Sequence, residues 1–296
     1  MIGPEVLQTW INLVPVTLAQ GLLYAFVALG VMIPFRILNL PDLSSEGVLP
    51  LGGAVTAALL VAGLHPLAAT AAAIACGFAA GAVTASIHLK FKVHSLLAGI
   101  LTITMLWSVN LRIMGKPNTS VFGLPSIYDW ISTAIMGSLA LQIAFFAALQ
   151  LALLALLHWG LRTQAGLGLR GVGANTQLAP ALGIDVVSYT VVGLGLANSF
   201  TALAGSLLVQ SQGYADVGMG FGMLVNGLAS VIIGESLTGR RTQVAQLAAP
   251  VVGAIVYYQL SSFALALGLA PSDLKMATAL FVLATIGWPL LRGSKP

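Results

Sequence analysis

Residues 14–35 read VPVTLAQGLLYAFVALGVMIPF, a stretch of 22 residues without a charged side chain. An α-helix needs about 20 apolar residues to cross the hydrocarbon core of a bilayer, so this stretch predicts a membrane-spanning helix. The whole chain has the same character, because 58% of its 296 residues are hydrophobic, 7% are charged and the mean hydropathy is +0.98. Soluble domains carry about 25% charged residues, so most of this protein's surface must be solvated by lipid.

Similar apolar stretches recur along the chain and predict an all-α, polytopic transmembrane helical bundle with about nine spans, in a range of eight to ten. The expected spans are 14–35, 47–63, 66–88, 95–113, 132–160, 187–213, 219–237, 244–270 and 274–291. The apolar blocks are far longer than the strands of a membrane barrel. We expect one transmembrane domain over 1–296, with close helix packing at small residues such as Gly77 and Gly81. The first span lacks a basic leader and is expected to be a retained anchor.

The cationic residues predict the orientation of the bundle. If the loop 162–185 is cytoplasmic, nine of the twelve Lys and Arg residues lie inside: Arg36, Lys90, Lys92, Arg162, Arg170, Arg240, Arg241, Arg292 and Lys295. Arg112, Lys116 and Lys275 then lie outside. This assignment puts the C-terminus in the cytoplasm, and it puts the N-terminus outside for nine spans or inside for eight or ten. Because the basic residues are spread between apolar blocks, the net charge of +4 does not indicate a nucleic-acid surface.

The segment 39–47, NLPDLSSEG, interrupts the apolar sequence with a proline, a glycine, two carboxylates and two hydroxyls. At membrane depth, such backbone persists only where protein or a water-filled cavity satisfies it, and broken helices of this kind often line transport paths. One interpretation is therefore a translocation pathway lined by Asp42, Ser44, Ser45 and Glu46. The alternative is a cytoplasmic turn in which Asp42 or Ser44 caps the next helix, and the sequence alone favours neither.

The loop 162–185, RTQAGLGLRGVGANTQLAPALGID, is the longest polar stretch on the expected cytoplasmic side. Its part GANTQLAPALGI predicts a short helix with an N-cap, a small apolar face and a glycine stop. Asn175 is the expected N-cap and Gly183 the expected stop. The apolar face consists of Leu178, Ala181 and Leu182. Such a helix suits docking of a soluble partner, whereas the alternative is a structured linker.

Other polar residues lie within or beside the expected spans. Asn226 is a further candidate for the pathway, whereas interhelical hydrogen bonding is the plainer interpretation for it and for Asn198, Gln210 and Gln212. Glu235 ends a span beside Arg240 and Arg241 and is expected to form an interfacial ion pair or a helix cap. On the expected outer side, four residues are candidates for docking a binding protein: Lys116, Asp129, Tyr214 and Asp216.

The sequence offers no constellation for catalysis or metal binding. The four histidines, His65, His88, His94 and His158, are scattered without an i, i+4 pair, so no metal site is expected. Cys76 is the only cysteine and lies in an apolar run, which indicates a packed residue. A phosphate loop of the form G-x-x-x-x-G-K-[ST] is absent from the sequence, so this chain is not expected to hydrolyse ATP or to hold a cofactor.

Several stretches resemble the permease subunits of ABC importers in the branched-chain amino acid and ribose permease family. PVTLAQGLLYAFVALGVMIPFRILNLPDLSSEG (15–47) is similar to that family's first block, in which a glycine-rich span precedes an Asn and then an acidic residue with a glycine. Asn39, Glu46 and Gly47 hold comparable places, so Asn39 joins the pathway candidates. LANSFTALAGSLLVQSQGY (196–214) and GMLVNGLASVIIGESL (222–237) resemble later blocks.

RGVGANTQLAPALGID (170–185) resembles the family's cytoplasmic coupling segment, which often ends in Leu-Gly-Ile. The resemblance implies that Arg170 begins this segment and that Leu182, Gly183 and Ile184 end it, with Asn175, Leu178 and Ala181 between them. Within the family, the chain is most similar to permeases described as tryptophan or tyrosine transport proteins.

The resemblance implies a non-enzymatic permease in a bacterial inner membrane that moves a small, amino-acid-like solute, aromatic amino acids included. The implied partners are a cytoplasmic ABC ATPase dimer that uses ATP and Mg²⁺, a periplasmic substrate-binding lipoprotein, a second permease copy and membrane lipid. The alternative function is an ion-coupled secondary transporter, in which buried carboxylates such as Asp42 and Glu46 would carry the coupling ion.

Overall fold

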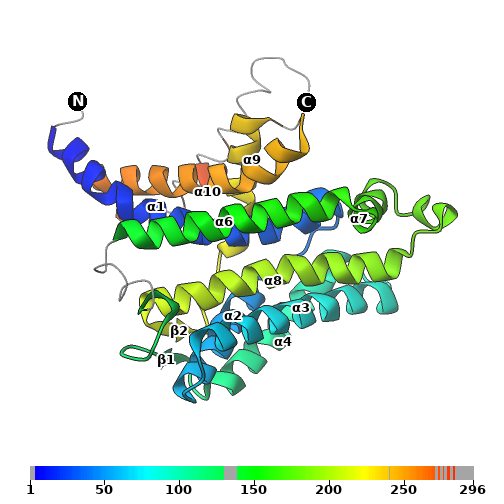
Figure 1. The fold of residues 1–296 in the computed structure, drawn as a ribbon, viewed down its shortest axis with the longest axis horizontal. Helices are drawn as coiled ribbons and strands as arrows, with labels where there is room; N and C mark the ends of the chain where they lie inside the picture. The colour runs from blue at the N-terminus through cyan, green and yellow to red at the C-terminus, as the bar shows by residue number, and fades with distance from the viewer. Residues whose placement is uncertain are drawn as a thin grey trace.

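The structure is a computed structural model that describes residues 4–129, 139–239 and 241–270, and the isolated residues 273, 276, 279, 280 and 283. The described residues form a bundle of helices with one short two-stranded sheet (Figure 1). The elements are α1 (Pro4–Met32), the π-helical turn η1 (Ile33–Ile37), α2 (Ser45–Val61), α3 (Pro66–Phe91), α4 (Ser95–Met114), β1 (Asn118–Ser120), α6 (Leu139–Arg162), α7 (Gln164–Ala174), the 3₁₀ turn η2 (Ala179–Leu182), α8 (Val186–Gln212), β2 (Tyr214–Asp216), α9 (Met223–Thr238) and α10 (Gln243–Ala266).

The expected polytopic helical membrane bundle is confirmed. Six described stretches are long and apolar enough to cross a membrane, namely α1 with η1, α3, α4, α6, α8 and α10. The other two apolar helices, α2 and α9, have only 17 and 16 residues. Each of these eight coincides with an expected span, but α1 begins well before residue 14 and α9 begins at Met223 instead of 219. The ninth expected span, 274–291, lies outside the described residues apart from isolated positions.

Close backbone contact holds the centre of the bundle together. α8 lies against α2 and α3, and small residues form these contacts. A Cβ at Gly52 would overlap the backbone of Ala202, and one at Gly81 would overlap the carbonyl oxygen of Leu194. Gly205 of α8 approaches Leu49 of α2 in the same way. Packing therefore explains these glycines, because helices associate closely in lipid where side chains are small.

The two ends of the bundle differ in charge. The ends of η1, α3, α6 and α9 and the starts of α4, α8 and α10 all lie toward the end of the bundle where α7 lies (Figure 1). This end, which we call the basic end, holds six described cations: Arg36, Lys90, Lys92, Arg162, Arg170 and Arg241. The opposite end, the ladder end, carries the β1–β2 pair together with Arg112 and Lys116. The fold thus segregates the cations as the orientation argument requires.

Candidate functional site

The chain reverses direction between η1 and α2 inside the bundle. Asn39 has a φ of 51°, in the left-handed region that asparagine tolerates better than most residues. The amides of Leu38 and Leu40 donate to the carbonyl oxygens of Ile33 (3.1 Å) and Pro34 (2.8 Å), so the turn is hydrogen-bonded without water. Leu38 packs against Gly193, seven residues into α8, which is a depth of about 10 Å at 1.5 Å per residue.

Asp42 lies at the centre of a buried polar network in this reversal. Its side chain is 1% exposed and accepts three hydrogen bonds: from the Ser44 amide (2.8 Å), the Ser44 hydroxyl (2.7 Å) and Asn198 Nδ2 (3.0 Å). The carboxylate is the acceptor in all three, which is the arrangement that an ionised carboxyl requires. Asn198 lies in the middle of α8 and also donates to the Leu194 carbonyl oxygen at 3.1 Å. The network therefore ties the interrupted segment to α8.

The sequence candidates of segment 39–47 separate into two groups. Asp42, Ser44 and Ser45 are buried, whereas Asn39 is exposed and Glu46 is half-buried. Asp42 accepts the Ser44 amide just before α2, but the Ser44 side chain makes no capping hydrogen bond. Asp42 itself is thus neither on an open turn nor part of an exposed lining in a single chain, because its carboxylate is already matched by donors from its own chain.

Glu46, in the first turn of α2, meets a second irregular segment. Its Oε1 accepts the backbone amide of Gly222, the N-cap of α9, at 3.1 Å. Gly220 packs so closely that a Cβ there would overlap the carbonyl oxygen of Glu46. The starts of two short helices, α2 and α9, therefore face each other inside the bundle. Paired discontinuous helices of this kind form the solute sites of many transporters.

Exposed aromatic side chains adjoin this junction of α2 and α9. Trp107 of α4 and Phe221 lie with ring centroids 5.4 Å apart, and they are 38% and 56% exposed. Asn226, half-buried in α9, accepts the Tyr257 hydroxyl at 2.7 Å. The sequence offered no reason to single out Trp107 or Phe221, since both lie in apolar runs. Together with Glu46, they give the junction a carboxylate and an accessible aromatic surface.

The coupling segment differs from the expected single helix. The longer helix, α7, lies upstream of Asn175, and Ala179–Leu182 forms one 3₁₀ turn. Asn175 Oδ1 accepts the amides of Gln177 and Leu178, both at 3.0 Å, and Gly183 ends the turn with a φ of 75°. The expected helix over 173–184 is therefore wrong in extent, because the Asn175 side chain organises a turn between α7 and η2.

The apolar residues of the coupling segment project from the basic end. Leu178 and Leu182 are 55% and 70% exposed, and Ala181 is exposed as well. We call these three residues the coupling knob. Ile184 is half-buried, and its side chain lies beside Gly171 of α7. The knob thus stands outside the bundle while the residue after it is fixed to α7.

α7 connects the coupling knob to the interrupted segment. Gly173 contacts the backbone so closely that a Cβ would overlap the carbonyl oxygen of Ile37. Leu169 and Val172 are buried in one cluster with Leu38 and Leu194. Since Leu38 lies four residues before Asp42, α7 packs directly against the reversal that carries the buried network.

The start of α8 is capped just outside the expected span. Asp185 accepts the amide of Val187 at 3.0 Å and also accepts the hydroxyl of Ser188. These donors, the Ser188 hydroxyl first, hold the pKa of the Asp185 carboxyl below its usual value. The charged cap therefore fixes the point where the coupling segment enters α8.

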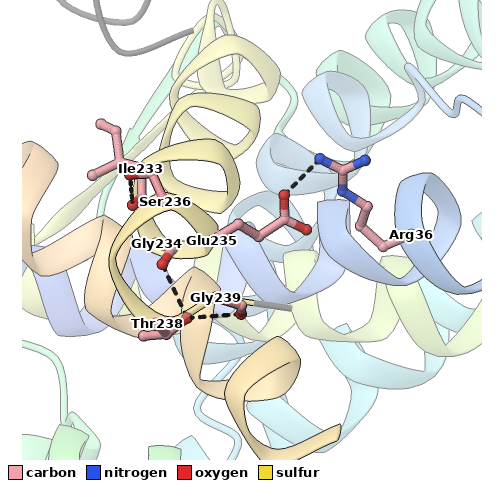
Figure 2. Close-up of polar contacts among 7 residues, drawn as sticks. All are labelled: Arg36, Ile233, Gly234, Glu235, Ser236, Thr238 and Gly239. Atoms are coloured by element: carbon pink, nitrogen blue, oxygen red, sulfur yellow. Dashed lines mark hydrogen bonds and ion pairs between the residues drawn. The ribbon is translucent and has the colours of Figure 1, made fainter. Parts of the chain in front are cut away.

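An ion pair joins η1 to α9 at the basic end (Figure 2). Arg36 Nη2 lies 2.6 Å from Glu235 Oε2, and the two side chains are 39% and 7% exposed. The expectation of an ion pair at Glu235 is confirmed with Arg36, which is 199 residues away, while Arg240 lies outside the described residues. The pair fixes the end of η1 against the end of α9.

The expected docking residues gather at the ladder end. β1 and β2 pair antiparallel, with Asn118 opposite Asp216 and Ser120 opposite Tyr214. Lys116 and Tyr214 are exposed and Asp216 is half-buried. A cavity of about 560 Å³ lies beside the ladder, and Asp129 lines it together with residues 210–213. The fold thus brings these four residues to one end of the molecule.

Two histidines have structural roles. The Nδ1 atoms of His65 and His94 accept the amides of Leu67 (3.3 Å) and Leu96 (3.4 Å) at the starts of α3 and α4. Over the described ranges, no three His, Cys, Asp or Glu side chains are grouped so that they could share a metal ion.

Comparison with known proteins identifies the family. Residues 15–286 match the family model described as the branched-chain amino acid transport system permease component. The tyrosine transport system permease protein of Clostridioides difficile is 40% identical over 267 residues, which cover 90% of this chain and 88% of that protein. An uncharacterised protein of Rickettsia prowazekii is 31% identical, with 90% and 93% covered. The ribose import permease protein of Escherichia coli is 26% identical, with 81% and 73% covered. No solved structure matches. The chain therefore belongs to the branched-chain amino acid transport system permease family, and it is a transport permease, not an enzyme.

Proposed function

We propose that this chain is the membrane subunit of an ATP-driven ABC importer for a small, amino-acid-like solute. The observation that carries the proposal is the coupling knob of Leu178, Ala181 and Leu182, exposed at the basic end and connected through α7 to the interrupted segment. An apolar knob on a cationic end is suited to a groove on a soluble partner, since hydrophobic anchors supply most of the binding energy of such interfaces.

The proposed assembly has the basic end in the cytoplasm of a bacterial inner membrane, which also places the C-terminus there. A cytoplasmic ATPase dimer binds the coupling knobs of two permease copies and uses ATP and Mg²⁺. A periplasmic substrate-binding lipoprotein docks on the ladder end at Lys116, Asp129, Tyr214 and Asp216. Two identical copies are proposed because the related systems usually have one permease.

The proposed solute path runs along the junction of α2 and α9. Glu46, Trp107, Phe221 and Asn226 keep exposed or half-buried side chains there, unlike the closed network at Asp42. A carboxylate attracts the ammonium group of an amino acid, and exposed aromatic rings stack on an aromatic side chain. The tyrosine transport permease at 40% identity supports an aromatic amino acid as the solute. Because such contacts are few, affinity would lie mainly in the binding protein.

In the proposed mechanism, ATP binding brings the two ATPases together and displaces both coupling knobs. Each knob moves α7, and Gly173 transmits the movement to Ile37 and Leu38. The interrupted segments then shift relative to α9, which opens the junction toward one side of the membrane and closes it toward the other. This is alternating access around a fixed solute site.

The proposal is tested in proteoliposomes that contain the permease and the ATPase encoded beside it. The binding protein with its ligand is expected to stimulate ATP hydrolysis, and Leu182→Asp should abolish this stimulation while leaving the bundle folded. Leu267→Asp is the matched control, because Leu267 is 49% exposed at the end of α10 and lies away from the knob. Normal stimulation in Leu182→Asp would refute the coupling assignment. Uptake that follows an ion gradient without any ATPase would show a secondary transporter instead.

A further inference from the structure

A small cavity lies at the basic end, where η1, α7, α9 and α10 meet. Its volume is about 210 Å³. Met32, Leu161 and Leu247 form its apolar wall. The polar side chains that line it come from four separate elements: Arg36, Arg170, Glu235, Gln243 and Gln246. Such convergence of distant polar residues on one hollow is typical of a ligand site.

Two of these side chains hold buried donors that find no acceptor in the part of the chain that the structure describes. Arg170 donates through Nη2 to the Leu161 carbonyl oxygen at 2.9 Å, but its Nε is buried and finds no acceptor among the described residues. Gln243 Nε2 is buried and unmatched within the same part of the chain. Because an unmatched buried donor costs free energy, two of them beside one cavity indicate an acceptor that binds there.

The charges that face the cavity favour an anion. Among the described residues that line it, two guanidinium groups, Arg36 and Arg170, stand against one carboxylate, Glu235, which leaves a net charge of +1 from these residues. Arg36 is already paired with Glu235, as Figure 2 shows, so the carboxylate is turned toward that guanidinium. Arginine donors bind phosphate oxygens through short, charge-assisted hydrogen bonds, and an amide donor can add one more.

The place of the cavity indicates where a phosphate would come from. Arg36 lies in the last turn of the apolar stretch Val6–Ile37, and Gln243 begins α10. Both positions are at the end of a hydrophobic span, where lipid headgroups lie. Basic pockets between transmembrane helices at this level bind anionic headgroups, and the apolar wall suits the glycerol and the first methylenes of a lipid.

We propose that this cavity is a phosphate-binding site, filled in the membrane by the headgroup of an anionic phospholipid. The phosphate accepts from Arg170, Gln243 and the outer edge of Arg36. It thereby holds η1, α7 and α10 together at the point where the coupling segment joins the bundle. Phosphate binding at this site requires neither transport nor ATP. A negative result for this site would therefore leave the proposed function untouched, and the reverse also holds.

The test uses the purified full-length chain in a mild detergent. Its melting temperature is measured with added phosphatidylglycerol or phosphatidylcholine, and bound lipid is counted by native mass spectrometry. Phosphatidylglycerol should raise the melting temperature more than phosphatidylcholine. Arg170→Gln and Gln243→Met should weaken phosphatidylglycerol binding about tenfold, as expected for loss of a hydrogen bond to a charged group. Gln243→Met removes the amide that carries the unmatched donor and keeps the contact of Arg170 with the Leu161 carbonyl oxygen, so it guards against a folding defect caused by loss of that contact.

The matched controls are Arg162→Gln and Gln164→Met, which change exposed residues of the same types at the same end. Both should keep the wild-type response to phosphatidylglycerol. An equal response in all four variants, or no preference for phosphatidylglycerol in the wild type, would overturn the proposal. A parallel titration with inorganic phosphate separates the sources. Stabilisation by inorganic phosphate alone assigns the site to a soluble anion, and stabilisation by phosphatidylglycerol alone assigns it to a lipid.

Discussion

The buried network at Asp42 permits a quantitative prediction for Asn198→Ala. This substitution removes one of the three donors to a carboxylate that is 1% exposed, the bond from Asn198 Nδ2 at 3.0 Å. Hydrogen bonds to charged groups contribute about 1.5–3 kcal/mol, so the free energy of unfolding should fall by about that amount. Asn110→Ala is the matched control. Asn110 is equally buried, but its Nδ2 donates to the uncharged Gly47 carbonyl oxygen at 3.2 Å and its Oδ1 has no partner in the described structure.

Asn110→Ala should therefore lower the free energy of unfolding by less than Asn198→Ala does, by about 0.5–1.5 kcal/mol. Both values are measured by titration of SDS into detergent micelles, with tryptophan fluorescence as the signal of unfolding. A double-mutant cycle with Asp42→Ala then isolates the contact, and its coupling energy with Asn198→Ala should reach about 1.5 kcal/mol or more. If Asn198→Ala costs no more than Asn110→Ala, or if the two substitutions at 42 and 198 are additive, Asp42 is not an ionised acceptor of Asn198.

Three further predictions concern other parts of the bundle. Gln150 is 1% exposed in α6 and neither its Oε1 nor its Nε2 has a partner within the described residues, so Gln150→Leu should raise the free energy of unfolding by about 1–3 kcal/mol in the same SDS titration. Gly253→Ala should lower it by about 1–3 kcal/mol because a Cβ would overlap a carbonyl oxygen of α9, whereas Gly160→Ala, with open space around it, should not destabilise. The lowered pKa of Asp185 stabilises the fold above the usual carboxyl pKa of 3.8, and this contribution is lost as the pH falls through the folded-state value. Asp185→Asn should therefore flatten the decline of the melting temperature below about pH 4, and an unchanged decline would show that the cap is not charged.

Hydropathy predicted the helices well because burial in lipid acts on each helix separately. A stretch such as 66–88 is apolar enough to span on its own, and α3 follows it closely at Pro66–Phe91. The irregular segment 39–47 was also visible, since Pro41 and a run of polar side chains cannot continue an apolar helix. Local composition thus located the elements and the interruption between two of them.

The contacts that define the candidate site were not predictable in this way. Glu46 and Gly222 are 176 residues apart, and Arg36 and Glu235 are 199 residues apart. The sequence around one residue of each pair gives no information about its partner, because these pairings depend on how the helices pack. The burial of Asp42 could not be predicted either. The local sequence, a carboxylate beside serines, is the same whether the segment is an open turn or forms a buried network with Asn198.

The coupling segment shows a third case, in which one end of the expected helix was predicted correctly and the other was not. Gly183 ends the segment as predicted, in the left-handed region, whereas Asn175 accepts the amides of Gln177 and Leu178 in a turn after α7 instead of capping a helix. α7 was missed because its glycines at 166, 168, 171 and 173 lower helix propensity. Its helix persists because those glycines permit contacts with the bundle, at Gly173 for example, that larger residues would prevent.

The β1–β2 pair has a consequence for how the two ends of the bundle communicate. From Asp216, the end of β2, the chain needs only residues 217–222 to reach the amide that Glu46 accepts. A partner bound at Tyr214 and Asp216 would therefore be joined to the contact between α2 and α9 by one short segment of chain. From the basic end, α7 packs against Ile37 and Leu38, which precede α2 in the chain. Under the proposed function, a loaded binding protein and the ATPases would therefore both act on the start of α2, each from its own end of the bundle.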